Sequence, residues 1–97
     1  MNVRYPLAAL LLVIAAPACA TGKLTCAAKP EQRKSIEALT ADLTKQGWQV
    51  RKAKLDGGCY EVYGTTPQGD RVEAYFDPIS FEKLYVERRG KVLFKKP

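Results

Sequence analysis

The chain has 97 residues, with 16 lysines and arginines against 10 aspartates and glutamates, and it has no histidine. This length allows at most one ordinary domain. Without histidine, Ser–His and Cys–His nucleophilic centres are excluded, and a metal site loses its commonest ligand.

Residues 1–20 are typical of an export signal. Arg4 supplies a positive start, residues 7–16 form an unbroken apolar run, and residues 18–20 (Ala-Cys-Ala) match the small-residue pattern that precedes cleavage. The apolar run is far shorter than the roughly 20 residues that cross a bilayer as a helix. We therefore expect a cleaved signal peptide and a periplasmic protein. The alternative is a lipoprotein attached to the membrane through Cys19.

The mature part, residues 21–97, would form a single domain near the lower size limit for a self-sufficient core. It retains two cysteines, Cys26 and Cys59. An even number of cysteines in a small exported protein favours a disulfide, and the alternative is a pair of free buried thiols. Zinc prefers about four ligands, so we expect no metal and no cofactor. Export also argues against nucleic acid as the partner of this basic chain.

The first predicted element is a helix over residues 30–46. Pro30 suits the first helical position, and the acidic residue after it suits the positive end of the helix dipole. Gly47 suits the position just after a helix. Three apolar residues repeat at helical spacing and form one stripe, namely Ile36, Leu39 and Leu43.

After the helix the hydrophobic pattern changes to a period of two, which predicts short strands. Residues 56–58 (Asp-Gly-Gly) and 66–70 (Thr-Pro-Gln-Gly-Asp) carry turn signals. The predicted strands are residues 48–51, 59–63, 71–76 and 83–87, with 91–94 as a short fifth. The result is an α+β fold, in which one N-terminal helix packs on one face of a four- to five-stranded antiparallel β-meander.

Alternation along the strands predicts which side chains face the helix. The predicted core joins one parity of the strands to the helix stripe: Ile36, Leu39, Leu43, Trp48, Val50, Tyr60, Val62, Val72, Ala74, Phe76, Leu84 and Val86. The other parity predicts an outer face of tyrosines among charges: Cys59, Glu61, Tyr63, Arg71, Glu73, Tyr75, Lys83, Tyr85 and Glu87.

Two interpretations of the outer face remain open. Tyrosine suits strands and packs across them, so an ordinary solvated sheet face explains its presence. Tyrosine also suits recognition, because its apolar body can meet a partner while its hydroxyl stays solvated. Under the second interpretation, a protein partner contacts the exposed sheet edge or a face made of Tyr63, Tyr75, Tyr85, Glu61 and Glu73.

Two basic clusters support a different function. The first consists of Arg51, Lys52 and Lys54, and the second of Arg88, Arg89 and Lys91. In an exported protein, such clusters would bind anionic polymers of the cell envelope or lipid head groups. Salt dependence distinguishes this hypothesis from a contact centred on tyrosines.

The sequence offers little for catalysis. The remaining acid–base groups are carboxylates, which in pairs can hydrolyse glycosides. They are Glu61, Glu73, Asp77, Glu82 and Glu87, interleaved with basic residues on neighbouring strands. Surface ion pairs explain this arrangement better. We predict that the protein is not an enzyme, and a carboxylate-based envelope hydrolase is the third hypothesis.

The helix end and the strands resemble the PepSY family, in particular its small, stand-alone, exported members. Residues 47–51 match the pattern Gly-aromatic-x-Val-Arg at the end of the helix. Residues 59–62 (Cys-Tyr-Glu-Val) and 72–78 (Val-Glu-Ala-Tyr-Phe-Asp-Pro) match two strands, and Cys26 matches a cysteine before the helix. The resemblance covers about residues 26–86.

The resemblance implies a role without a mechanism. PepSY domains occur in propeptides of secreted metallopeptidases and in cell-envelope regulators, where they restrain peptidases or mediate protein contacts. A non-catalytic interaction or regulatory module is therefore implied. Residues 77–82 depart from the family pattern, because Phe81 stands where a glycine is common. This leaves Ile79 and Phe81 as apolar residues in a loop.

Overall fold

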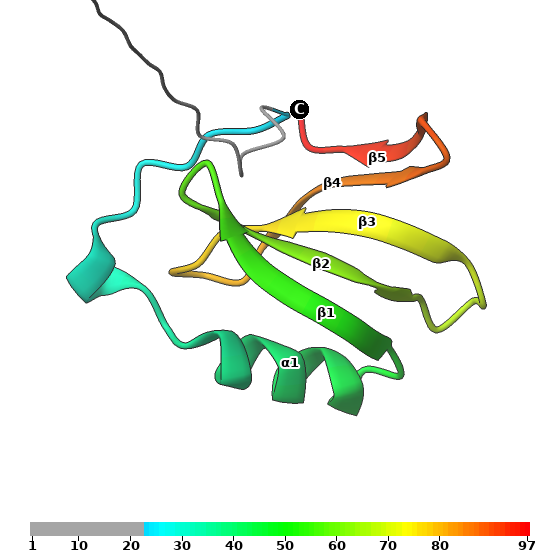
Figure 1. Cartoon of the computed structure of the whole chain (residues 1–97), viewed down its shortest axis with the longest axis horizontal. Coiled ribbons are helices and arrows are strands. Elements are labelled where there is room, and N and C mark those ends of the chain that lie inside the picture. Colours follow the sequence, from blue (N-terminus) through cyan, green and yellow to red (C-terminus); the bar gives the residue numbers. More distant parts are fainter. Residues whose placement is uncertain (1–22) are drawn as a thin grey trace, which may run out of the picture.

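The computed structural model describes residues 23–97 (Figure 1). The predicted signal peptide lies outside the described residues. The described part contains η1 (Pro30–Gln32), α1 (Ile36–Lys45), β1 (Gln49–Asp56), β2 (Cys59–Thr65), β3 (Arg71–Phe76), β4 (Lys83–Arg88) and β5 (Lys91–Lys95). No helix in this part is long and apolar enough to span a membrane.

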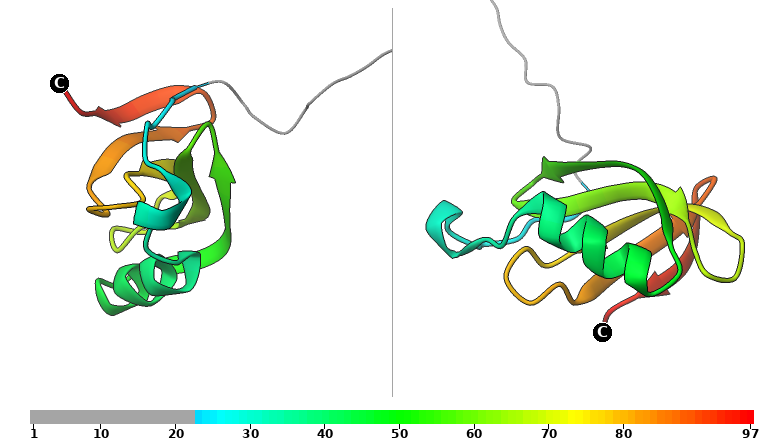
Figure 2. Two further views of the ribbon diagram at one scale, coloured as in Figure 1. Left: turned by 90° about the vertical axis from the view of Figure 1, so that its left-hand side faces the viewer. Right: turned by 90° about the horizontal axis from the view of Figure 1, so that it is seen from below.

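The five strands form one antiparallel sheet in the order β1-β2-β3-β4-β5. Each strand pairs with its neighbour in sequence, which confirms the predicted α+β meander and its fifth strand. The helix α1 packs on one face of the sheet, next to β1. In Figures 1 and 2, β5 lies at the far side of the sheet from α1. The face near β5 is therefore not covered by the helix.

The helix begins later than predicted, because Pro30 opens a separate 3₁₀ turn, η1. The true N-cap of α1 is Ser35, whose Oγ accepts a hydrogen bond of 3.0 Å from the backbone N–H of Ala38. Just before it, the N–H of Lys34 donates to the carbonyl oxygen of Pro78 at 2.9 Å. This tertiary bond replaces a helical one, so the helix is preceded by an extended segment and is not the first element of the described chain.

The core lies between α1 and the sheet. Its buried members are Leu39, Leu43, Trp48, Tyr60, Val62, Val72, Ala74, Phe76 and Val86. All of them belong to the predicted set, and Ile36 and Val50 pack against them with partial exposure. The helical and period-two patterns therefore predicted most of the core.

A bulge in β4 exchanges the faces of two residues. The pairing of β3 with β4 skips Leu84, so that Lys83 takes the position opposite Phe76. Lys83 accordingly lies on the helix side, with its Nζ 4.7 Å from the ring centre of Phe94. Leu84 is half-buried and lines a hollow with Tyr85 on the outer side. The predictions that placed Leu84 in the core and Lys83 on the outer face are both wrong.

The leading segment, residues 23–29, passes over the outer face of the sheet. The predicted disulfide is confirmed, since Cys26 is joined to Cys59 with the two Cα atoms 5.0 Å apart. The N–H of Cys26 also donates to the carbonyl oxygen of Gly57 at 2.8 Å. A Cβ at Gly57 or Gly58 would collide with a backbone carbonyl oxygen of the leading segment. These two glycines therefore let the segment lie directly on the β1–β2 turn.

The loop between β3 and β4 explains the departure from the family pattern. The Oδ1 of Asp77 accepts hydrogen bonds from the N–H groups of Ile79 (2.7 Å) and Ser80 (3.1 Å), which tightens the loop. Phe81 has a φ of 66°, in the left-handed region that favours glycine. Its ring is half-buried against the core, and the Nζ of Lys34 lies 4.9 Å from the ring centre. Packing thus offsets backbone strain at Phe81, while Ile79 stays exposed.

Candidate interaction surfaces

The outer face is less open than predicted, because the leading segment covers part of it. Tyr75 and Glu61 are both fully buried, whereas Tyr63, Glu73 and Tyr85 are half-buried. The prediction of an exposed tyrosine face is therefore wrong at Tyr75 and Glu61. The disulfide is the physical reason, since it draws the leading segment onto the end of β2.

Tyr75 has a structural role at the covered part of this face. Its hydroxyl donates a hydrogen bond of 2.9 Å to the Oδ2 of Asp56, which is itself buried. Its ring meets that of Tyr85 edge to face, with the ring centres 6.0 Å apart. A buried carboxylate needs such a donor to offset its lost hydration. Tyr75 therefore stabilises the fold rather than offering a contact to a partner.

Glu61 is a buried carboxyl with weak compensation in the same region. Neither of its oxygens has a hydrogen-bond partner, and the nearest cation, the Nζ of Lys54, is 3.8 Å away. Burial raises the pKa of Glu61 above its ordinary value, and Glu73 and the charge of Asp56 raise it further, while Tyr63 and the charge of Lys54 partly oppose the rise. Burial, with the neighbouring Glu61, also raises the pKa of Tyr63 to about 12.

Glu87 lies on the same face, but its pKa is lowered where that of Glu61 is raised. Its Oε2 is 2.7 Å from the Nζ of Lys23 in the leading segment, and the Tyr85 hydroxyl donates to its Oε1 at 3.0 Å. The hydrogen bond from Lys23 lowers the pKa of Glu87. The same contact raises the pKa of Lys23. This ion pair holds the leading segment against β4.

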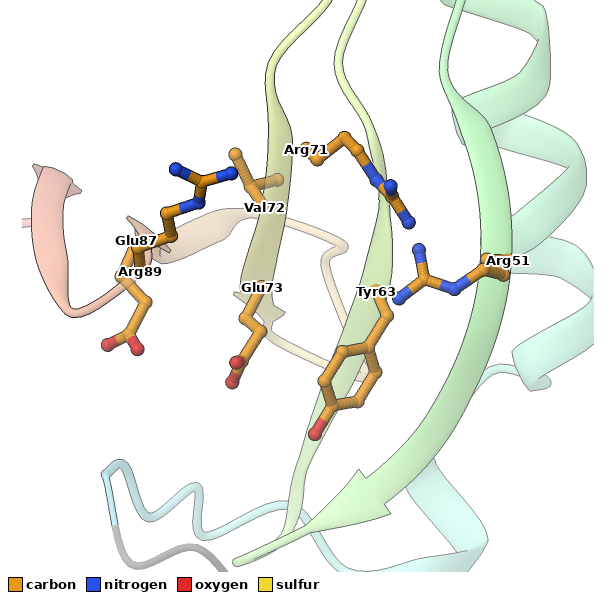
Figure 3. Close-up of a pocket in the computed structure, with 7 residues that line it drawn as sticks. All are labelled: Arg51, Tyr63, Arg71, Val72, Glu73, Glu87 and Arg89. Carbon is orange, nitrogen blue, oxygen red and sulfur yellow. The ribbon is translucent and has the colours of Figure 1, made fainter.

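A shallow hollow of about 140 Å³ lies on the uncovered part of the outer face (Figure 3). Arg51, Arg71 and Arg89 line it together with Tyr63, Val72, Glu73 and Glu87. The guanidinium groups of Arg51 and Arg71 point toward one another, and the carboxylates lie at the other end of the hollow. We refer to this site as the arginine hollow. The fold thus brings one member of each predicted basic cluster together with Arg71.

The other cluster residues have different surroundings. Lys52 and Lys54 place their Nζ atoms 5.5 and 5.9 Å from the ring centre of Tyr63. Arg88 pairs with Asp70, with 2.8 Å between Nη1 and Oδ1. Lys91 is exposed at the start of β5. The residues of the two predicted clusters therefore differ in their contacts, and neither cluster is a patch of unpaired basic side chains alone.

The last strand forms a second candidate surface, which we call the β5 edge and define as Val92, Leu93 and Phe94. These three consecutive apolar side chains are 49 %, 41 % and 37 % exposed. Beside them lies a groove of about 430 Å³, whose lining includes Trp48 and Val86 from the core. A run of exposed apolar residues on a strand with one unpaired edge is typical of a protein-binding site.

The acidic side chains of the described residues bear on the hydrolase hypothesis. Within residues 23–97, no three histidine, cysteine, aspartate or glutamate side chains are grouped so as to hold a metal ion. Of the five carboxylates considered for hydrolysis, Glu82 is paired with Lys96 at 3.0 Å and Glu87 with Lys23. The arrangement serves binding and stability better than acid–base chemistry.

Comparison with known proteins identifies the family. Residues 5–86 match the family model described as peptidase propeptide and YPEB domain, PepSY_2. The chain belongs to the PepSY family. No curated protein and no solved structure matches it. Family membership and the disulfide are both consistent with a location outside the cytoplasm.

The PepSY match ends at Val86, so the β5 edge lies beyond the matched residues. Sequence reasoning proposed contact at an exposed sheet edge but did not name the residues of β5 as that edge. It also missed Arg71, which was assigned to surface ion pairs. The alternation of side chains along the strands could have indicated Arg71, since it lies on the outer face with Tyr63.

Proposed function

We propose that this PepSY protein is a non-catalytic regulatory module of the cell envelope that binds a protein partner through the β5 edge, and that the partner is a peptidase. Support for the peptidase comes from the family, which is described by its occurrence in peptidase propeptides. Support for export comes from the signal-like residues 1–20 and from the disulfide. In this proposal residues 21–97 act in the periplasm, after cleavage at 20 rather than lipidation at Cys19.

The exposure of the β5 edge carries the proposal. A partner segment in extended conformation would pair with the free backbone groups of β5. Alternate side chains of that segment would reach the groove beside Trp48 and Val86. Pairing of this kind would occupy the segment and so restrain a peptidase that needs it.

The charges beside the β5 edge define the partner segment. Lys91 and Lys95 flank the three apolar residues, and Lys96 follows. In a symmetric antiparallel pair of two copies centred on Leu93, Lys91 would face Lys95 of the second copy, and like charges directly opposite are destabilising. The lysines thus oppose self-association and favour a segment whose apolar residues are flanked by aspartate or glutamate.

The two exposed leucines on the edge strands allow a matched test. Leu93 on β5 is 41 % exposed and Leu55 on β1 is 43 % exposed. A photo-crosslinking residue is placed at position 93 or 55 in whole cells, and the adducts are identified by mass spectrometry. We expect a peptidase adduct from position 93 alone. The activity of the purified peptidase should then change when the wild-type domain or the Leu55→Asp variant is added. It should not change when the Leu93→Asp variant is added.

Two results would contradict this function. One is an equal yield of the same adducts from both positions, which would mean that the β5 edge has no special role. The other is a captured peptidase that responds equally to Leu93→Asp and Leu55→Asp. Circular dichroism of both variants checks that each one is folded, and both substitutions lie at exposed positions.

A further inference from the structure

The arginine hollow is not explained by a partner strand at the β5 edge. We infer that it is a binding site for a phosphate group, held by the guanidinium groups of Arg51 and Arg71, with Arg89 at the far side of the hollow beside Val72. This site is separate from the proposed peptidase contact, and the two proposals can fail independently.

Unused positive charge is the first argument. None of the three arginines forms an ion pair within residues 23–97, although acidic side chains lie nearby. Asp70 is engaged by Arg88, and Glu87 by Lys23 and Tyr85. The guanidinium groups of Arg51 and Arg71 nevertheless point toward one another (Figure 3). Two like charges arranged in this way are stabilised when an anion lies between them.

Backbone geometry is the second argument, because it directs Arg51 toward Arg71. The pairing of β1 with β2 shifts register between Val50 and Lys52, so Arg51 is an extra residue in a bulge. The bulge allows Arg51 and Lys52, although adjacent in sequence, both to lie near Tyr63 on the outer side. Gly64 permits the close approach of the strands, since a Cβ there would meet the carbonyl oxygen of Gln49.

Arg89 is directed by a turn that is unfavourable for arginine. Arg89 and Gly90 have φ values of 52° and 81°, as the two central residues of a tight hairpin turn require. Asparagine or glycine would adopt the conformation of Arg89 with less strain. Arg89 therefore adopts this turn at a conformational cost.

Size and geometry favour phosphate over carboxylate. A hollow of about 140 Å³ can hold one tetrahedral anion. A single guanidinium satisfies both oxygens of a carboxylate in one plane, whereas two guanidinium groups that point toward one another suit the several oxygens of a phosphate. Arg71 also lines two adjacent hollows, one with Arg88, Arg89 and Lys91 and one with Arg51. The phosphate would thus lie within a continuous basic strip.

The test is a titration of the oxidised protein with inorganic phosphate, followed by amide chemical shifts at constant ionic strength. We expect saturable shifts at residues 51, 71, 73 and 89, with sulfate competing and with acetate binding at least about fivefold more weakly. Arg71→Gln should weaken phosphate binding about tenfold. Lys45→Gln, which removes one exposed positive charge from the helix, should change the affinity less than about twofold.

A second variant keeps the test sharp if Arg71→Gln perturbs folding. Arg51 is exposed, so Arg51→Gln should fold as well as the wild type and still bind phosphate about tenfold more weakly. Equal affinity for acetate and phosphate would overturn the inference. Equal weakening by Lys45→Gln and Arg71→Gln would overturn it too, because only net charge would then matter.

The source of the phosphate is decided by vesicles. Sedimentation with phosphatidic acid vesicles, but not with phosphatidylcholine vesicles, and its loss in Arg71→Gln would identify a lipid head group. Saturable phosphate binding without sedimentation would identify a soluble phosphate compound. Both outcomes require Arg71, and the absence of both would contradict the site.

Discussion

Polar side chains are buried at one end of the sheet, whereas two arginines at the other end are exposed. At the clamped end, which contains the β1–β2 turn and the β3–β4 loop, the leading segment buries Asp56, Glu61 and Tyr75. At the open end, which contains the β2–β3 and β4–β5 turns, Arg71 and Arg89 remain exposed without ion pairs within residues 23–97. The first end holds the fold together, and the second leaves charge available.

The difference shows how a small domain can separate stability from recognition. A mature chain of this size has little apolar area to bury, so a covalent link at one end supplies stability that packing does not. The arginine hollow and the β5 edge both lie away from that link. Changes at the clamped end should therefore alter unfolding, and changes at the open end should alter binding.

Loss of the disulfide at the clamped end should have the largest effect on the free energy of unfolding. We expect replacement of Cys26 and Cys59 by serine to lower the free energy of unfolding by roughly 3–4 kcal/mol, because a link across 33 positions no longer restricts the unfolded chain. Urea denaturation of oxidised wild type and the double variant measures the difference. A loss below about 1 kcal/mol would show that the leading segment does not depend on the link.

Replacing one glycine at each end of the sheet by alanine should give a smaller difference in stability between the two ends. Gly58 and Gly90 both have positive φ, at 84° and 81°, so alanine is strained at either position by about 1 kcal/mol. At Gly58 the new Cβ would also collide with the backbone carbonyl oxygen of Cys26, whereas at Gly90 nothing lies within 4 Å. Gly58→Ala should therefore destabilise by about 2 kcal/mol more than Gly90→Ala. Equal losses in thermal unfolding would disprove the close contact.

The buried carboxyl of Glu61 should give the smallest effect and a distinctive pH dependence. Its pKa is raised by burial, so the folded state binds its proton more tightly than the unfolded state does. The resulting contribution to stability is present below the unfolded pKa and is lost as the pH rises through the folded pKa. Glu61→Gln does not titrate, and its stability relative to the wild type should therefore increase as the pH rises from 4 to 8.

The control for this experiment is Glu37→Gln, at an exposed position on α1. Its difference from the wild type should stay nearly constant over the same pH range. Denaturant unfolding at five pH values measures both variants. If Glu61→Gln loses stability relative to the wild type as the pH rises, the carboxylate is compensated in the fold and the description of the clamped end is wrong.

The hydrophobic periodicity predicted the helix and the strands because the side chains that each contributes to the core repeat with the period of that element. The stripe of Leu39 and Leu43 and the alternation of Val62, Ala74 and Val86 are direct consequences of helix and strand geometry, and the core follows from them. The disulfide followed from compartment and cysteine number. The geometry of the loop at residue 81 was left open, because Phe81 departs from the family pattern, and the structure shows that Phe81 adopts the left-handed conformation itself.

Bulges and the path of the leading segment were not predictable in the same way. One extra residue in a strand leaves the composition unchanged but inverts the faces after it, as Lys83 and Leu84 show. The leading segment has no periodic pattern, so nothing in the sequence indicated that it would bury Tyr75. Both candidate sites contain such a feature, since the strand pairings skip Arg51 in β1 and Leu93 in β5.

Amide hydrogen exchange on the two edge strands tests the central claim most directly. The oxidised protein is mixed with millimolar concentrations of an acetylated peptide that has three valines between two glutamates. Pairing at the β5 edge predicts slower exchange at residues 91–95 and no change at residues 49–56 of β1. Unchanged exchange in β5, or equal slowing in both strands, would contradict recognition through this edge.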